Sequence, residues 1–353
     1  MNSHTYSIVK YSPEYKESLL GLLKIMWKDL KESEVREQFE WRYERNPYHH
    51  SPYIYLAVVD AKVVGFRAFV LQLFTLKKSI YQVFSPADAI VHPDYRRKGI
   101  FSTLNDFFLK DLAETGMKNA LIVNLSSNKY STPGYLKQGW QETDGLKFYA
   151  FRVSLLNYLK NLLGNEKQKK SAVQIVNNKT GTSIEISQSL NSRDLADFVN
   201  ENRVKNRLTN LRDESYFLWR YSREGGDIFF LYYRDGGQLK GYAVVKRLSR
   251  FQFSLEEYLA ADQSLYIELL QTLSKILSIS ILRTWNLSQD DRALLSKSNF
   301  FPEPAGLLKI LGKQRLPVLV RPVAKSVKED DFIIADLDMR HINNWQLYLA
   351  DKH

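Results

Sequence analysis

The chain has 353 residues, 44% hydrophobic and 13% aromatic, which is long and apolar enough for two buried cores and excludes a disordered chain. Its 50 lysines and arginines against 39 acidic residues leave a net charge of +11, which favours anionic partners without choosing among a phosphorylated cofactor, nucleic acid and a membrane surface. No cysteine is present, so disulfides, thiol nucleophiles and cysteine-ligated zinc are excluded.

The order of predicted elements in the first half indicates a mixed α/β sheet with flanking helices. Apolar residues alternate or run together in the expected strands and recur every three to four residues in the expected helices. In chain order we expect a strand at 6–11, helices at 12–30 and 33–47, a hairpin at 53–74, a strand at 83–91, a helix at 100–116, a strand at 118–127, a helix at 131–139 and a strand or hairpin at 140–153.

A basic turn, "HPDYRRKG" at 92–99, joins the strand at 83–91 to the following helix. That helix carries apolar residues at the spacing of one buried face: Ile100, Leu104, Phe107, Phe108 and Leu112. The start of a helix presents free backbone N–H groups and a positive dipole end, which together suit a phosphate. The turn is therefore a predicted phosphate site.

The second half repeats landmarks of the first. "FEWRY" at 39–43 recurs as "FLWRY" at 217–221, followed in each copy by a hairpin pattern with a glycine, Gly65 and Gly241. Further on, "NLS" at 124–126 recurs at 286–288. Two landmarks in the same order indicate duplication of one domain.

The second copy is shorter where the first has its basic turn, so we expect only the first copy to hold a phosphate. The predicted domains are residues 1–163, a polar linker at 164–180, and a degenerate second domain at 181–353. We expect the amphipathic segment 154–163 to pack on the first sheet, although a basic amphipathic helix can also lie on a membrane. The tail 332–353 predicts two strands that complete the sheets.

The basic turn and its helix resemble the acyl-CoA-binding motif of the GNAT superfamily of N-acetyltransferases, [R/Q]-x-x-G-x-[G/A]. Arg96 and Gly99 match at the family spacing, whereas Phe101 stands where the family prefers glycine or alanine. "NKYSTPGYLKQGW" resembles a second family pattern through Asn128, Tyr135 and Gly139. The resemblance covers roughly residues 5–152 and implies two tandem GNAT-like mixed β-sheet domains, the second degenerate.

The resemblance implies that acetyl-CoA, or another acyl-CoA, binds at this turn. Backbone N–H groups there can cradle a pyrophosphate, with glycine at 99 allowing close approach, and the arginines and lysine can reach further phosphates. The candidate cofactor-binding residues are Ile90, Val91, Arg96, Arg97, Lys98, Gly99, Ile100, Phe101, Ser102 and Asn128. As a plain helix cap, Asn128 is equally well explained.

Transfer of an acyl group to an amine needs a deprotonated nucleophile and a proton for the departing thiolate. Tyr135 matches the family's general acid, and Asp88, on the strand before the basic turn, is the candidate base. Glu40, His49 and His50 are further candidates near the expected acceptor site. The equivalent of Tyr135 in the second copy is a leucine.

These features predict a cytoplasmic N-acyltransferase that uses an acyl-CoA and a small-molecule primary amine. The overall pattern resembles bacterial GNAT proteins of surface-polysaccharide synthesis, which implies an amino sugar as acceptor. An aminoacyl transferase of the Fem type, using tRNA, and a non-catalytic GNAT-fold binding protein are the alternatives. Six histidines without ligand-like spacing lead us to expect no metal, and we expect neither nucleic acid nor a membrane as partner.

Overall fold

A computed structural model describes residues 6–117, 120–147, 149–163, 174–177, 181–223, 227–285, 287–303, 316–324 and 327–352. The chain divides into two compact units. The first comprises residues 1–143 and 318–340, and the second comprises residues 144–317 and 341–352. The division falls at Thr143, not at residue 163 as expected, because the chain from there on packs with the second unit. Most of the expected linker, and Asn286 of the repeated "NLS", lie outside the described residues.

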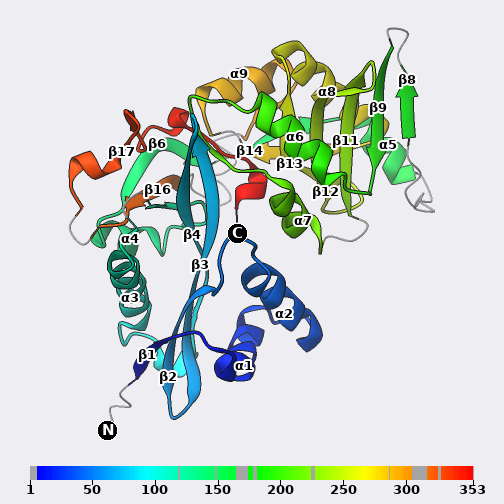
Figure 1. The fold of residues 1–353 in the computed structure, drawn as a ribbon. Coiled ribbons are helices and arrows are strands. Elements are labelled where there is room, and N and C mark those ends of the chain that lie inside the picture. Colours follow the sequence, from blue (N-terminus) through cyan, green and yellow to red (C-terminus); the bar gives the residue numbers. More distant parts are fainter. Residues whose placement is uncertain are drawn as a thin grey trace. The chain divides into compact units, whose positions relative to one another are not determined.

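The sheet of the first unit has the order β1-β2-β3-β4-β5-β16-β6 (Figure 1). Its strands are β1 (Ser7–Lys10), β2 (Tyr53–Val59), β3 (Lys62–Leu76), β4 (Ser79–Val91), β5 (Ala120–Asn124), β16 (Leu316–Pro322) and β6 (Gln141–Lys147). Strands β1 to β4 pair antiparallel, β4 and β5 pair parallel, and β16 pairs antiparallel with β5. The mixed sheet predicted from the sequence is confirmed. The insertion of β16 was not predicted, because its partner lies almost 200 residues away in the chain.

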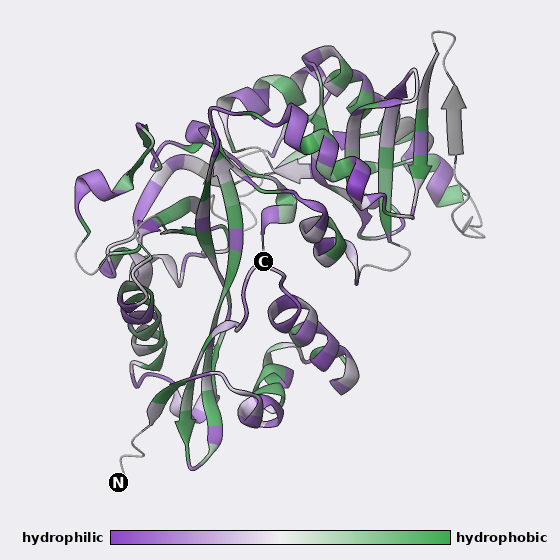
Figure 2. Cartoon of the chain, viewed as in Figure 1, coloured by the Kyte–Doolittle hydropathy of each residue, from purple (hydrophilic) through white to green (hydrophobic). Residues whose placement is uncertain are grey.

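Helices cover both faces of this sheet. On one face lie α1 (Lys16–Met26) and α2 (Glu32–Phe39), which continues into a π-helical turn, Glu40–Glu44. On the other lies α3 (Ile100–Glu114), whose Ile100, Leu104, Phe108 and Leu112 enter the core. Figure 2 shows β3 and β4 as mostly apolar and α3 as mixed, in keeping with one buried helix face.

The second unit contains a sheet of eight strands in the order β15-β7-β14-β13-β12-β11-β9-β8. They are β15 (Phe301–Pro302), β7 (Tyr149–Val153), β14 (Ile281–Trp285), β13 (Gln252–Ala260), β12 (Gln238–Arg247), β11 (Ile228–Asp235), β9 (Thr182–Ser187) and β8 (Gln174–Asn177). The expected strand or hairpin at 140–153 is therefore shared between two sheets, because β6 and β7 pair with different neighbours.

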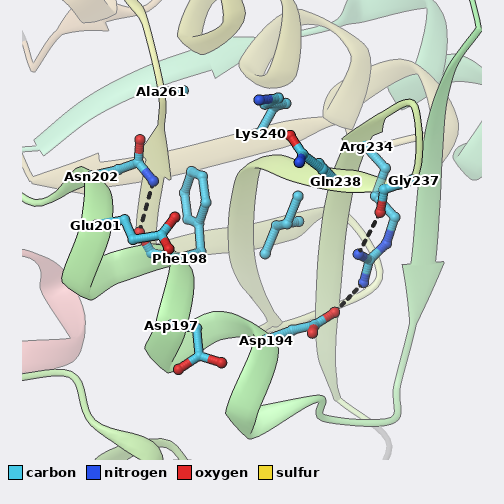
Figure 3. Close-up of a pocket in the computed structure, with 11 residues that line it drawn as sticks. Asp194, Asp197, Phe198, Glu201, Asn202, Arg234, Gly237, Gln238, Lys240 and Ala261 are labelled. Carbon is cyan, nitrogen blue, oxygen red and sulfur yellow. Dashed lines mark hydrogen bonds and ion pairs between the residues drawn. The ribbon is translucent and has the colours of Figure 1, made fainter.

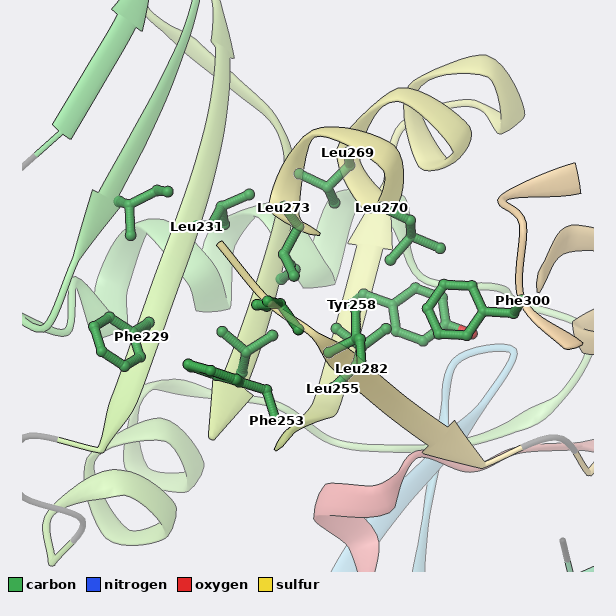
Figure 4. Packing of buried hydrophobic residues seen from close by; sticks show 14 of the residues in the cluster. Phe229, Leu231, Phe253, Leu255, Tyr258, Leu269, Leu270, Leu273, Leu282 and Phe300 are labelled. Atoms are coloured by element: carbon green, nitrogen blue, oxygen red, sulfur yellow. The ribbon is translucent and has the colours of Figure 1, made fainter. Parts of the chain in front are cut away.

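The second sheet is also covered on both faces. Leucines of α8 (Gln263–Ile276) pack on one face of β11 to β13 (Figure 4). Helix α9 (Gln289–Lys297) adds Leu295 to the same core. The other face meets α6 (Ser192–Asn202) and α7 (Glu214–Tyr221), where Tyr242 of β12 contacts Phe198 and Phe217. Alternate residues of one strand thus serve two cores.

The tail differs from the two strands expected at 332–353. It forms short 3₁₀ turns, the two-residue hairpin β17 (Ile333–Ile334) and β18 (Leu337–Asp338), and β19 (Trp345–Gln346). Strand β19 pairs in parallel with β10 (Leu208–Asn210) of the second unit. No helix in the described part of the chain is long and apolar enough to cross a membrane.

Candidate functional site

The candidate site begins where β4 leaves β5. The two strands pair only over Gln82–Phe84, and β4 continues to Val91 paired with β3. Ile90 and Val91 lie on this continuation, opposite Phe66 and Gly65. Beyond Phe84, the edge of β4 that faces β5 has no strand partner among the described residues.

The basic turn that follows has the backbone geometry of an anion cradle. Arg97 has φ 64° and Gly99 has φ 76°, so Gly99 caps α3 from the left-handed region that favours glycine. In the described chain, no acceptor pairs with the backbone N–H groups from Arg97 to Ser102. Consecutive free N–H groups at a helix N-terminus form a site for phosphate oxygens.

Three exposed cations surround this turn. Arg96 donates from Nε to the carbonyl oxygen of Val91 at 3.3 Å, and the Nζ of Lys98 lies 4.9 Å from the ring centre of Tyr95. Arg97, which has the left-handed φ itself, has an exposed side chain. These contacts hold positive charge beside the cradle without neutralising it. No carboxylate in the described chain forms a salt bridge with any of the three.

Tyr135, on the short helix α4 (Thr132–Lys137), is buried and bonded to a buried arginine. Arg67 of β3 donates from Nη2 to the phenolic oxygen at 2.5 Å, and from Nε to Asn105 at 2.9 Å. Because the phenolic oxygen accepts this bond, its own proton is left for another acceptor. The guanidinium also stabilises negative charge on that oxygen when the proton leaves.

Sequence reasoning missed Arg67. The sequence does mark Arg67 as unusual, because it is a charged residue inside the apolar run "VVGFRAFV" of a strand. Arginine is almost never fully buried unless it is paired, so an arginine there implies partners close by. Which partners they are could not be deduced, because Asn105 and Tyr135 come from two later helices.

Phe101 and Asn128 both contact other parts of the first unit. Phe101, which replaces a small family residue, packs edge-on against Tyr135, with ring centres 6.0 Å apart. The side-chain oxygen of Asn128 accepts from the N–H groups of Tyr130 and Ser131 at 2.9 and 3.1 Å. Asn128 therefore caps its own turn, as the alternative interpretation expected, and its role toward a cofactor stays a prediction.

Asp88 is bonded to two residues of the π-helical turn Glu40–Glu44. Its carboxylate accepts from Arg42 Nη1 at 2.5 Å and from the Tyr43 hydroxyl at 2.8 Å. Burial raises the pKa of the Tyr43 phenol well above its usual range, and the neighbouring carboxylate adds to this rise. The π-helical turn places Arg42 and Tyr43 side by side over Asp88.

The other acid–base candidates engage different partners. Glu40 pairs with Lys16 at 2.8 Å and with Arg45 at 3.1 Å, on the outer side of the same turn. Burial lowers the pKa of His49, whose ring lies edge-on to Tyr53, and His50 is exposed. No bond in the described chain joins these side chains to Asp88.

The family follows from comparison with known proteins. The model of an acetyltransferase (GNAT) domain matches residues 11–143. These residues form a GNAT domain. The match ends where the main segment of the first unit ends, so the turn, Asp88 and Tyr135 all belong to the GNAT domain.

Solved structures share the fold over about nine-tenths of this chain. A conserved protein of unknown function from Enterococcus faecalis V583, described as a probable N-acyltransferase, has a TM-score of 0.65 at 14% identity over 90% of this chain and 72% of its own. A GCN5-related N-acetyltransferase from Anabaena variabilis ATCC 29413 has a TM-score of 0.62 at 12% identity, covering 91% and 73%. Eis1 from Mycobacterium abscessus has a TM-score of 0.55 at 13% identity, covering 90% and 74%. No curated protein sequence matches.

The second unit lacks the anion cradle of the GNAT domain. Strand β13 ends at Ala260, and α8 begins at Gln263 after only two residues. The carboxylate of Asp262 accepts from the N–H groups of Ser264 and Leu265 at 2.8 and 3.0 Å. The N-terminus of α8 is thus capped by a negative charge of the chain itself, which would repel a phosphate.

The second unit also differs at the positions equivalent to the candidate catalytic residues Tyr135 and Asp88. Leu295 accepts a backbone bond from Phe300, as Tyr135 does from Trp140, so a buried leucine stands in place of the phenol. Glu257 occupies the register of Asp88, three residues before the partner of the repeated glycine. It is fully buried against Arg212 and Tyr216.

The second unit contains a cavity of about 360 Å³ that, unlike the basic turn of the first unit, is lined by several carboxylates (Figure 3). Three acidic residues of α6 line it, Asp194, Asp197 and Glu201, together with Arg234, which pairs with Asp194 at 2.5 Å. Carboxylates disfavour the phosphates of an acyl-CoA. Among the residues that the structure describes, no group of three or more histidine, aspartate or glutamate side chains could hold a metal ion.

Proposed function

We propose that this chain is an acyl-CoA-dependent N-acyltransferase with one donor site, located in its GNAT domain. The observation that carries this proposal is the open cradle from Arg97 to Ser102, with its cations and its left-handed glycine. The donor supplies an activated thioester. The chain's own residues bind its phosphates, align it beside the part of β4 that β5 does not pair with, and supply the proton that the leaving group takes up.

Tyr135 is proposed as the acid that protonates the departing thiolate. An amine attacks the thioester carbonyl carbon, the carbon–sulfur bond breaks, and the sulfur takes the phenolic proton. Arg67, bonded to the phenolic oxygen, stabilises the charge left behind. Its position on a central strand keeps this oxygen in place, because Asn105 and the Ala87 carbonyl hold the same guanidinium.

Asp88 is proposed to act on the amine. Its carboxylate is partly exposed, with 20% of the side chain accessible, and its Oδ2 is occupied by Arg42 and Tyr43. The other oxygen, Oδ1, has no partner in the described chain and can accept a proton from an ammonium directly or through water. A primary amine, carried for instance on an amino sugar, is the acceptor class that this carboxylate favours.

Isothermal titration of the full-length protein with acetyl-CoA tests the donor site. We expect saturable binding of one molecule per chain, and two would contradict the assignment of a single cradle. Release of free thiol is then measured with amino sugars, nucleotide-linked amino sugars and lysine peptides as acceptors. Binding without thiol release from any acceptor would favour a non-catalytic binding protein, and no binding at all would favour the aminoacyl-transferase alternative.

A further inference from the structure

Helix α5 (Leu155–Leu163) packs on the second unit through its polar side. Asn157 donates from Nδ2 to the carbonyl oxygen of Ile279 at 3.1 Å. Asn161 donates to the carbonyl oxygen of Ser278 and to the hydroxyl of Ser280 at 3.1 and 3.0 Å. From the sequence we expected this helix to pack on the first sheet instead. The asparagine bonds, formed with residues 278–280 of the second unit, turn the polar side of the helix toward that unit.

The apolar side of α5 is consequently turned outward. At about 100° per residue, the asparagines lie near one direction and the leucines span about 120° around the opposite one. These leucines are between 46% and 85% exposed, and no residue of the helix is buried. They form the leucine face: Leu155, Leu156, Leu159, Leu162 and Leu163. Single exposed leucines are ordinary, but a continuous stripe marks a surface that meets another apolar phase.

Cations flank the leucine face. Lys160 is exposed at its edge on the helix itself. Tyr158 contacts Phe251 of the neighbouring β12–β13 turn, with ring centres 5.0 Å apart, and the guanidinium of Arg250 lies 5.5 Å from the Phe251 ring centre. The described residues of α5 and this turn contribute no carboxylate.

We propose that the leucine face and its flanking cations bind an anionic lipid surface. Leucines on one side of a helix, with lysine and arginine at the edge, suit the boundary between acyl chains and charged headgroups. A second copy of the chain fits less well, since a symmetric contact through this face would bring like charges together. The inference is independent of the proposed acyl transfer.

Vesicle sedimentation with the full-length protein tests this inference. Vesicles containing about 40% phosphatidylglycerol should bind at least about tenfold more protein than pure phosphatidylcholine vesicles, and salt at about 0.5 M should abolish the difference. Leu159→Glu, at the centre of the leucine face, should lower binding about tenfold. Leu218→Glu, at a 52% exposed position on α7 of the same unit, is the matched control and should bind as the unmodified protein does.

A double variant, Lys160→Glu with Arg250→Glu, keeps the leucines and reverses the flanking charge. It should also lose at least about tenfold in binding to the anionic vesicles, and it decides the question if Leu159→Glu fails to fold. Equal binding to neutral and anionic vesicles, or unchanged binding by both variants, would overturn the proposal. A dimer in lipid-free solution that Leu159→Glu dissociates would instead identify a second copy as the occupant.

Discussion

The chain contains a strand–turn–helix unit twice, and the backbone N–H groups at the start of the helix are free in one copy and capped in the other. In the first unit, eight residues separate β4 from α3, and Gly99 leaves the N–H groups of the helix free beside three cations. In the second, two residues separate β13 from α8, and the carboxylate of Asp262 takes those N–H groups. The same sheet architecture therefore either leaves the N-terminus of the following helix free or closes it with a carboxylate, depending on one short turn.

The carboxylates at the β-bulges of the two copies extend this contrast. Asp88 and Glu257 stand in equivalent registers, each held by an arginine and a tyrosine. The pair formed by Asp88 is partly exposed. The pair formed by Glu257 is closed off by Asp351 of the C-terminal turn, which also binds Arg212. A functional role is open only to the accessible carboxylate.

The largest expected effect is a difference in stability between variants of these two carboxylates. Glu257→Gln should lower the free energy of unfolding by about 3 kcal/mol, because it breaks a fully buried ion pair. Asp88→Asn should cost less, about 1–2 kcal/mol, because that pair is partly exposed and the amide keeps an oxygen for Arg42 and Tyr43, but it should lower kcat. Urea unfolding and steady-state kinetics of both variants measure this. Equal losses of stability, with kcat unchanged in Asp88→Asn, would remove Asp88 from the mechanism.

Tyr135 and its counterpart Leu295 are compared by substitution. Tyr135→Phe removes only the proton donor, so kcat should fall about 10²-fold while the dissociation constant of the acyl-CoA stays nearly the same. Tyr135→Leu, which introduces the residue of the second unit, should lose at least as much. Turnover at the unmodified rate by Tyr135→Phe on an accepted amine would leave water as the proton source.

Gly99 tests the cradle directly. Gly99→Val should weaken binding of the acyl-CoA about tenfold, or about 1.4 kcal/mol, because a side chain intrudes where the backbone meets the pyrophosphate. Gly116→Val is the matched control, since Gly116 has φ 71° and equally open surroundings at the other end of the same helix. Both variants carry the same backbone strain, so calorimetry should show a loss of affinity in the first alone. A similar loss in both would mean that strain, not the cradle, lowers affinity.

Asp262 gives the smallest expected effect. Its hydrogen bonds with Ser264 and Leu265 lower the pKa of its carboxyl, so the stability that it contributes is present at neutral pH and disappears as pH falls through that lowered pKa. Asp262→Ala should cost about 0.5–1 kcal/mol at neutral pH, less at about pH 3, and Asp262→Asn should retain most of the cap. Urea unfolding at the two pH values measures the difference. A constant difference at both would contradict an ionised cap.

What the sequence determined by itself was local. The basic turn with its glycine, the buried face of α3 and the spacing of Tyr135 follow from short stretches, because turn preferences and helix periodicity act over a few residues. The duplication was also visible, as two ordered sets of residues. The mixed sheet of the first unit, apart from β16, followed from its strand and helix patterns.

What only the tertiary structure decided depends on partners far away in the chain. The bond between Arg67 and Tyr135 joins residues 68 positions apart, and β16 returns to pair with β5. Asp351, near the C-terminal end, pairs with Arg212, which also holds Glu257. The side that α5 turns outward was decided in the same way, by two asparagines that bond to residues 278–280. A sequence shows that such groups need partners, but only the folded chain brings a particular partner within hydrogen-bonding distance.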